Sequence, residues 1–213
     1  MLVSGRGSNM QAIVQTLRDG DLPGDVVAVI ANSAQAAALD WAREHDLPAR
    51  AVPHKEYASR EQFDVALADV IDSYRPDYVL LAGFMRVLTE GFVERFSGKL
   101  VNVHPSLLPA FPGLHTHQQA LATGVQWHGC TVHFVTPVLD HGPIIAQGVV
   151  PVRSGDTPDE LANRLLKLEH IVYSEVVQWL AEGRVRLDAM QRVHVEGIDC
   201  RAFSLPSQDG KTL

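Results

Sequence analysis

The stretch Asn-Val-His-Pro-Ser-Leu-Leu-Pro at residues 102–109 marks the point where an apolar strand gives way to a loop. Successive strand side chains point to opposite faces, so Asn102 and His104, two residues apart, lie on the same face. Pro105 then ends the strand. An amide and an imidazole at an apolar strand end are costly to bury without partners, and catalytic residues are common on such loops. We therefore expect a functional site at this strand end.

Outward from this strand, short apolar runs rich in β-branched residues alternate with segments of helical period, which is typical of βαβ units on a parallel sheet. Before the motif, strands are predicted at residues 2–3, 26–31, 49–52, 78–82 and 100–103, and helices at 9–18, 36–45, 59–73 and around Phe92 and Phe96. After it, the pattern predicts a helix at 116–122, strands at 130–136 and 144–151, and a helix capped by Asp156-Thr157-Pro158 that runs to about Leu180.

These elements predict an α/β fold with a single Rossmann-like domain over residues 1–203. The expected sheet is mostly parallel and twisted, with helices on both faces. Residues 204–213 are mostly polar and aperiodic, so they are predicted to form a mobile tail.

Composition narrows the range of partners. The 213 residues carry 18 Lys plus Arg against 25 Asp plus Glu, a net charge of -7, and no basic run suggests nucleic-acid binding. Cys130 and Cys200 form no CxxC pair, which favours a reducing compartment. The first residues show no basic n-region followed by a long apolar stretch, and no apolar span is long enough for a bilayer, so we expect neither a targeting segment nor a membrane span. We expect a cytoplasmic protein that acts on small molecules without nucleic acid or membrane, and a homodimer is left open.

The segment Ser4-Gly5-Arg6-Gly7-Ser8-Asn9 joins the first predicted strand to the first helix. Its backbone N–H groups and the positive end of the helix dipole would face a common point, which suits a phosphate. A dinucleotide site would need a third glycine and an acidic residue where this chain has Met10 and Asn32, and no Walker lysine follows the glycines. The alternative is a tight turn with a Ser or Asn helix cap and no ligand.

Asn102 and His104 could supply the oxyanion donor and the proton-transferring group that chemistry at a carbonyl carbon requires. Asp140, in a loop between two apolar strands, is the best candidate for an accompanying carboxylate. A carboxylate beside His104 would favour the charged imidazole and make it a competent acid. The alternative for Asp140 is a solvated turn residue.

Six histidines fall between residues 104 and 141 inclusive, so a metal site has to be considered. No HExxH motif or Cys/His quartet accompanies them, and we predict no metal. His133 alternates with apolar neighbours and is predicted to be a core histidine. Glu169 and His170, midway along the last predicted helix, could form a surface pair.

Four motifs together carry a resemblance to a known family. They are Ser4-Gly5-Arg6-Gly7-Ser8-Asn9, Leu81-Ala82-Gly83-Phe84-Met85-Arg86, the stretch 102–109 with Gly113-Leu114-His115, and Leu139-Asp140-His141-Gly142-Pro143. Over nearly the whole chain the sequence resembles the phosphoribosylglycinamide formyltransferases, folate-dependent enzymes of purine synthesis. The Asn, His and Asp set alone is shared by the wider formyltransferase group, including methionyl-tRNA formyltransferase and formyltetrahydrofolate hydrolase. The glycine loop is the narrower signal, because it cradles the ribonucleotide phosphate in the purine enzymes.

The resemblance implies two ligand sites. Gly7, Ser8 and Asn9 would bind the phosphate of glycinamide ribonucleotide, and Glu169 its ribose or glycinamide end. The co-substrate 10-formyltetrahydrofolate would be held by Arg60, Met85, Arg86, Val87, Leu88, Asn102, Thr136, Pro137, Val138, Leu139 and Asp140.

The resemblance also implies a reaction. The substrate amine attacks the formyl carbon directly, while Asn102 and His104 stabilise the tetrahedral oxyanion. Asp140 sustains the protonated imidazole and helps relay protons to the leaving folate nitrogen. Neither a covalent enzyme intermediate nor a metal is implied.

Three features depart from the family pattern. The first strand is shorter than the family's usual opening, Leu166 stands where members often carry a polar residue, and His141 occupies a position that is usually small. Two other functions stay open: a formyltetrahydrofolate hydrolase, against which the phosphate loop argues, and a nucleotide-binding sensor without turnover, against which the retained Asn102, His104 and Asp140 argue.

Overall fold

The structure is a computed structural model that describes residues 1–20 and 23–205. The chain divides into two compact units. The first contains Met1–Asn102 and Phe134–Val138, and the second contains Val103–His133 and the chain from Leu139 onward.

The first unit is built on parallel strands: β1 (Leu2–Val3), β2 (Val29–Ala31), β3 (Ala49–Ala51), β4 (Val79–Leu81) and the first three residues of β5 (Leu100–His104). Their order is β5-β4-β1-β2-β3, and every pair is parallel. The register sets Leu81 opposite both Leu2 and Asn102. Because parallel strands end at one edge, the segments that follow β1 and β4 emerge close to Asn102.

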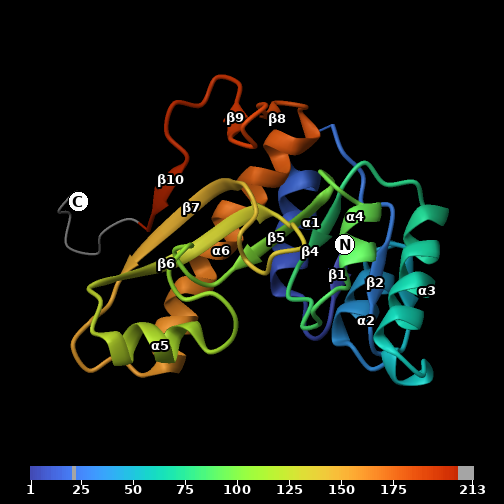
Figure 1. Cartoon of the computed structure of the whole chain (residues 1–213), viewed down its shortest axis with the longest axis horizontal. Coiled ribbons are helices and arrows are strands. Elements are labelled where there is room, and N and C mark those ends of the chain that lie inside the picture. The colour runs from blue at the N-terminus through green and yellow to red at the C-terminus, as the bar shows by residue number, and fades with distance from the viewer. Residues whose placement is uncertain (21–22, 206–213) are drawn as a thin grey trace. The chain divides into compact units, whose positions relative to one another are not determined.

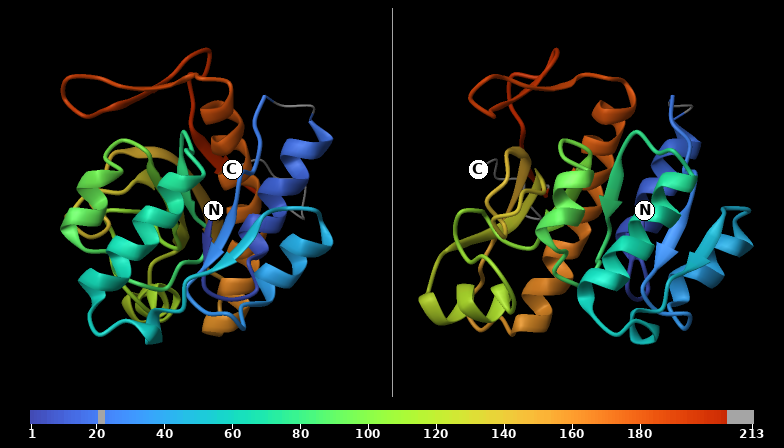
Figure 2. Two further views of the ribbon diagram at one scale, coloured as in Figure 1. Left: turned by 90° about the vertical axis from the view of Figure 1, so that its right-hand side faces the viewer. Right: turned by 45° about the vertical axis from the view of Figure 1, so that its right-hand side comes forward.

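Helices cover both faces of these strands. They are α1 (Ser8–Asp19), α2 (Ala37–Glu44), α3 (Arg60–Ser73) and α4 (Glu90–Arg95), with a short 3-10 turn, η1 (His54–Glu56). Figure 2 shows α1 and α2 on one face and α3 and α4 on the other. The core under α3 and α4 contains alternate strand residues, among them Leu2, Ile30 and Leu81, packed against Phe63 and Leu67. The alternation of buried strand residues therefore explains why both faces are covered.

The second unit contains the antiparallel pair β6 (Trp127–Phe134, whose last residue belongs to the first unit) and β7 (Ile144–Pro151), with β10 (Ala202–Ser204) parallel to β7. It also contains α5 (Thr116–Thr123), the long α6 (Pro158–Ala181), and a hairpin of β8 (Val185–Leu187) and β9 (Val193–Val195). Figure 1 shows α6 along β7, and the two are in contact. A Cβ on Gly148 of β7 would lie 2.8 Å from the Leu168 side chain, so this close packing depends on glycine.

The predicted fold class is confirmed: the protein is α/β, and its sheet strands are mostly parallel. The bounds predicted for residues 144–151 match β7, and Thr157 caps α6 with Pro158 in its first turn, as predicted. Glu160 completes a capping box that was not predicted. Strand β5 runs one residue beyond its predicted end, to His104, and stops before Pro105. The sequence pattern missed β8, β9 and β10, because three-residue strands are too short to produce a readable period. Ser204, the first residue of the predicted tail, ends β10, and residues 206–213 of that tail lie outside the described residues.

Candidate active site

The glycine loop between β1 and α1 has a backbone that only glycine accommodates easily. Gly7 is the N-cap of α1 with φ +72°, and a Cβ there would lie 2.8 Å from the Cβ of Ala38. Gly7 makes no side-chain cap hydrogen bond, so the cap proposed as the alternative is not formed at this helix start. The first N–H groups of α1 therefore keep the arrangement that an anion site requires.

The segment after β4 lies against this loop. The backbone N–H of Met85 donates to Ser4 Oγ at 2.9 Å, across 81 positions of sequence. The Met85 side chain is 72% exposed and Val87 is also exposed, while the Arg86 guanidinium lies 5.1 Å above the centre of the Phe63 ring. Within the first unit, the predicted folate segment is thus beside the predicted phosphate loop.

Other predicted folate residues in the first unit lie at element ends. Arg60 is the first residue of α3 and is exposed, and Leu88 packs against the core. The N–H of Val135 donates to the carbonyl of Leu100 at 2.9 Å, which fixes the start of the 136–138 segment beside β5. Thr136 Oγ1 donates to the carbonyl of Val138 at 3.2 Å and so closes a turn.

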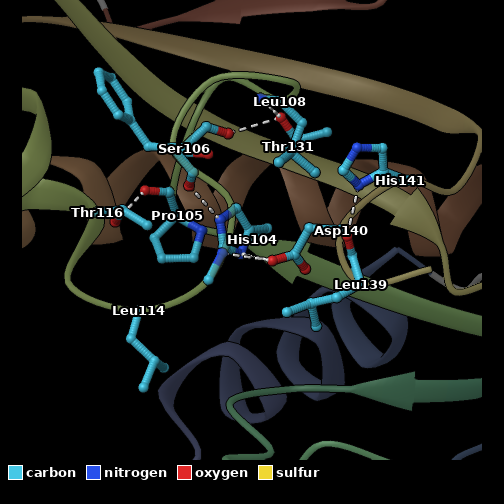
Figure 3. A network of polar contacts seen from close by, with 12 residues as sticks. His104, Pro105, Ser106, Leu108, Leu114, Thr116, Thr131, Leu139, Asp140 and His141 are labelled. Atoms are coloured by element: carbon cyan, nitrogen blue, oxygen red, sulfur yellow. Dashed lines mark hydrogen bonds and ion pairs between the residues drawn. The ribbon is translucent and has the colours of Figure 1, made fainter. Parts of the chain in front are cut away.

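In the second unit the structure brings His104 and Asp140 together, 36 positions apart in sequence. His104 Nδ1 lies 3.5 Å from Asp140 Oδ2, and only 7% and 8% of the two side chains are exposed (Figure 3). The other ring nitrogen, Nε2, donates to the carbonyl oxygen of Phe111 at 3.0 Å. A carbonyl only accepts and a carboxylate favours a donor, so both contacts are satisfied when both ring nitrogens carry protons. These two contacts hold the imidazole ring in one orientation, away from solvent.

Backbone geometry holds Asp140 in place. Its Oδ2 accepts from the N–H of Gly113 at 2.8 Å, and its backbone is left-handed, with φ +53°. Next to it, His141 Nδ1 donates to the carbonyl of Leu139 at 2.6 Å, as Figure 3 shows. The solvated-turn alternative for Asp140 is therefore wrong.

The loop after His104 is tied to the strands of the second unit. Thr131 Oγ1 donates to the carbonyl of Ser106 at 2.7 Å and accepts from the N–H of Leu108 at 3.0 Å. Gln147 donates to the carbonyl of Leu108 at 2.9 Å, and Thr116 Oγ1 to that of Pro105 at 2.6 Å. These bonds keep the loop that carries the Phe111 and Gly113 backbone groups in one arrangement.

A pair of neutral histidines lies behind this loop. His117 Nδ1 and His128 Nε2 are 3.1 Å apart, and the His128 ring faces the Phe111 ring at 6.3 Å. Burial, followed by the charges of His117 and His104, lowers the pKa of His128 to about 4. Burial, followed by the charge of His104, also lowers the pKa of His117. Among the described residues, no group of three or more His, Cys, Asp or Glu side chains is arranged to hold a metal ion.

Glu169 is 9% exposed on α6, so the surface-pair interpretation of Glu169 and His170 is wrong. Burial raises the pKa of the Cys130 thiol, and the charge of Glu169 raises it further. His133 is buried in β6, as its alternation predicted.

Sequence reasoning missed the groups that orient the predicted side chains. Phe111 and Gly113 act through backbone atoms, which have no side-chain signature. Ser4 could have been suspected from its place at the end of β1, but nothing indicated its bond to Met85. Asp64, buried in α3 and bonded to the N–H of Thr89, was not singled out.

None of the helices in residues 1–20 and 23–205 is long and apolar enough to cross a membrane.

Comparison with known proteins identifies the family. A family model described as formyl transferase matches residues 1–177. Phosphoribosylglycinamide formyltransferase of Escherichia coli (strain K12) is 46% identical over 187 residues, which cover 88% of each chain. The trifunctional purine biosynthetic protein adenosine-3 of Homo sapiens is 44% identical over 187 residues, 88% of this chain and 18% of that protein.

Solved structures agree. The phosphoribosylglycinamide formyltransferase of Coxiella burnetii matches with a TM-score of 0.87 at 43% identity, covering 95% of this chain and 96% of that one. A formyltetrahydrofolate deformylase from Burkholderia mallei matches with a TM-score of 0.81 at 32% identity, covering 91% and 68%. The resemblance carried by the four motifs is confirmed. The chain belongs to the formyl transferase family, in the group of the phosphoribosylglycinamide formyltransferases.

Proposed function

We propose that this chain transfers the formyl group of 10-formyltetrahydrofolate to the amine of glycinamide ribonucleotide. The observation that carries the proposal is the buried His104–Asp140 pair, held by backbone groups of Phe111 and Gly113. When an amine attacks a formyl carbon, negative charge develops on the formyl oxygen, and an imidazolium fixed nearby stabilises that charge. Similarity to phosphoribosylglycinamide formyltransferases over 88% of the chain supports the choice of the two substrates.

The ribonucleotide binds through its phosphate to Gly7, Ser8 and Asn9. The left-handed Gly7 and the start of α1 support this assignment, because together they direct N–H groups and the positive helix end to one point. Glu169 accepts hydrogen bonds from the ribose hydroxyls or from the glycinamide end. Its carboxylate is suited to either partner.

The folate co-substrate binds to a second set of residues. Exposed apolar side chains at Met85, Val87, Val138 and Leu139 support the pterin contact, since exposed apolar groups often mark a ligand surface. Arg60 and Arg86 attract the acidic tail. The full set is Arg60, Met85, Arg86, Val87, Leu88, Asn102, Thr136, Pro137, Val138, Leu139 and Asp140.

The reaction needs three tasks from the chain. The amine nitrogen forms a bond to the formyl carbon, and Asn102 and one N–H group of His104, turned from its present acceptor, stabilise the oxyanion. Asp140 keeps the imidazole charged and relays the proton that the amine loses to the folate nitrogen. The bond from that nitrogen to the formyl carbon then breaks, which gives the formylated ribonucleotide and tetrahydrofolate.

The proposal also includes the domain organisation, the cellular compartment and the partners of the enzyme. Residues 1–203 act as one functional domain in the cytoplasm, and the substrates are small molecules used without a metal ion. The net charge of -7 disfavours nucleic acid as a partner. A homodimer is compatible with this function.

A formyltetrahydrofolate hydrolase is the second candidate, favoured by the match to the deformylase from Burkholderia mallei. One assay separates the two. The purified chain is mixed with 10-formyltetrahydrofolate, with and without glycinamide ribonucleotide, and the absorbance change of deformylation is followed. We expect a change only when both are present; a change without the ribonucleotide would favour the hydrolase, and no change in either case would contradict both.

A further inference from the structure

A buried carboxyl group on α3 belongs to neither the proposed catalytic residues nor the proposed ligand-binding residues. Asp64 is 2% exposed, and its Oδ2 accepts from the backbone N–H of Thr89 at 2.6 Å. Its Oδ1 is buried and has no hydrogen-bond partner among the described residues. Burying a carboxyl group beside an apolar core is costly, so its presence there requires a compensating role.

The hydrogen bond between Asp64 and Thr89 fixes one end of the folate segment, which is residues 85–88. Thr89 follows Leu88 directly and is the N-cap of α4, so Asp64 holds the point where this segment joins the helix. The other end is held by the bond from Met85 to Ser4. Residues 85–88 are thus attached at both ends.

Phe63, which precedes Asp64 on α3, orients Arg86 of this segment. The Arg86 guanidinium stacks on Phe63, and Arg86 Nε is buried with no hydrogen bond among the described residues. Its direction therefore depends on that ring and on the backbone that Asp64 anchors. Arg60 precedes Phe63 and Asp64 by three and four positions, so all three share one side of α3.

We propose that Asp64 is a positioning residue for the folate site, which acts by anchoring Thr89 and thereby setting Arg86 beside Arg60 for the acidic tail of the co-substrate. This inference rests on the proposed function. A purely structural role would lower stability without separating one substrate from the other. The positioning role affects folate binding selectively.

The test measures KM for each substrate and Kd for 10-formyltetrahydrofolate in the full chain. Asp64→Ala removes the acceptor, and we expect KM and Kd for the folate to rise about tenfold or more, with KM for the ribonucleotide within about twofold. Asp64→Asn keeps an acceptor oxygen and should restore folate binding to within about threefold of wild type. Asp69→Ala breaks a different contact between α3 and α4, to Arg95, and should leave both KM values unchanged.

If Asp64→Ala does not fold, a second pair of variants tests whether the hydrogen bond to Thr89 supports folate binding. Thr89→Pro deletes the donor N–H at a position whose φ of -70° suits proline, while Thr89→Val keeps the N–H and loses only the side-chain cap. Weaker folate binding in Thr89→Pro than in Thr89→Val supports the inference, and equal binding overturns it.

Unchanged folate binding in Asp64→Ala, or equal rises in both KM values, would also overturn it. If wild type shows no turnover that depends on the amine, the proposed function fails, and the Kd comparison still tests Asp64.

Discussion

The glycine loop of the first unit and the loop at residues 105–116 of the second are held in shape by different means. The first depends on backbone shape, since a left-handed Gly7 sits where any Cβ would meet Ala38. The second depends on side chains and their anchors, because Thr131, Thr116 and Gln147 tie it down. A loop that depends on backbone shape should be disrupted when a substitution adds one carbon atom, a Cβ. A loop that depends on side chains should be disrupted when a substitution removes a few side-chain atoms.

The largest effect should come from the side-chain region. His104→Ala and Asp140→Asn should each lower kcat on the order of a thousandfold, because one removes the donor and the other the charge that sustains it. Asparagine can still accept from Gly113, so the loop should keep its place. Steady-state kinetics combined with thermal unfolding would check this, and a near-normal kcat would remove the pair from the mechanism.

The backbone region should respond to an added methyl group. Gly7→Ala should cost about 3 kcal/mol of unfolding free energy, from left-handed strain plus the clash with Ala38, and should weaken ribonucleotide binding. The matched control is Gly124→Ala, which has φ +76° and open space around a Cβ, and should cost about 1 kcal/mol. Urea unfolding of both variants measures the difference, and equal losses would show that the close contact with Ala38 is unimportant.

The neutral histidines behind the loop at residues 105–116 predict a pH dependence of stability. The pKa of His128 is lowered to about 4, so between the unfolded value of 6.5 and that value the unfolded chain binds more protons. Stability from this group is complete above pH 6.5 and is lost as pH falls toward 4, by on the order of 2 kcal/mol. Chemical unfolding of wild type and His128→Gln across this range should give a smaller slope for the variant; identical slopes would contradict the assignment.

The smallest effect should come from one anchor of the same loop. Thr131→Val keeps the shape of the side chain and removes the hydroxyl that serves Ser106, Leu108 and Gln147. The unfolding free energy should fall by about 1.5 kcal/mol and kcat should fall modestly, because buried groups lose their partners. If stability drops while kcat is unaffected, the loop does not need this anchor to hold His104 and Asp140 in place.

The sequence predicted the parts of the site that follow from local rules. Both Asn102 and His104 lie on β5, two residues apart, and the strand ends before Pro105, as predicted. The glycine loop was recognisable because its conformation demands glycine. The pairing of Asp140 with His104 could only be suggested, since loop geometry across 36 positions leaves no periodic signal.

The features that the sequence could not predict are mostly contacts of backbone groups and the burial of individual side chains. The carbonyl of Phe111 and the N–H of Gly113 have no residue-type signature, although they orient both catalytic candidates. Glu169 looked like a surface residue because its burial is decided by tertiary packing. Asp64 was overlooked because one acidic residue on an amphipathic helix ordinarily faces water, whereas here it faces Thr89.

The most direct test of the account follows the formyl carbon itself. With 10-formyltetrahydrofolate labelled at that carbon, the enzyme and glycinamide ribonucleotide should yield a labelled amide on the ribonucleotide, observed by nuclear magnetic resonance, and no labelled formate. Label recovered as formate, or retained on the folate, would contradict the assignment of His104, Asn102 and Asp140 to direct transfer to the amine.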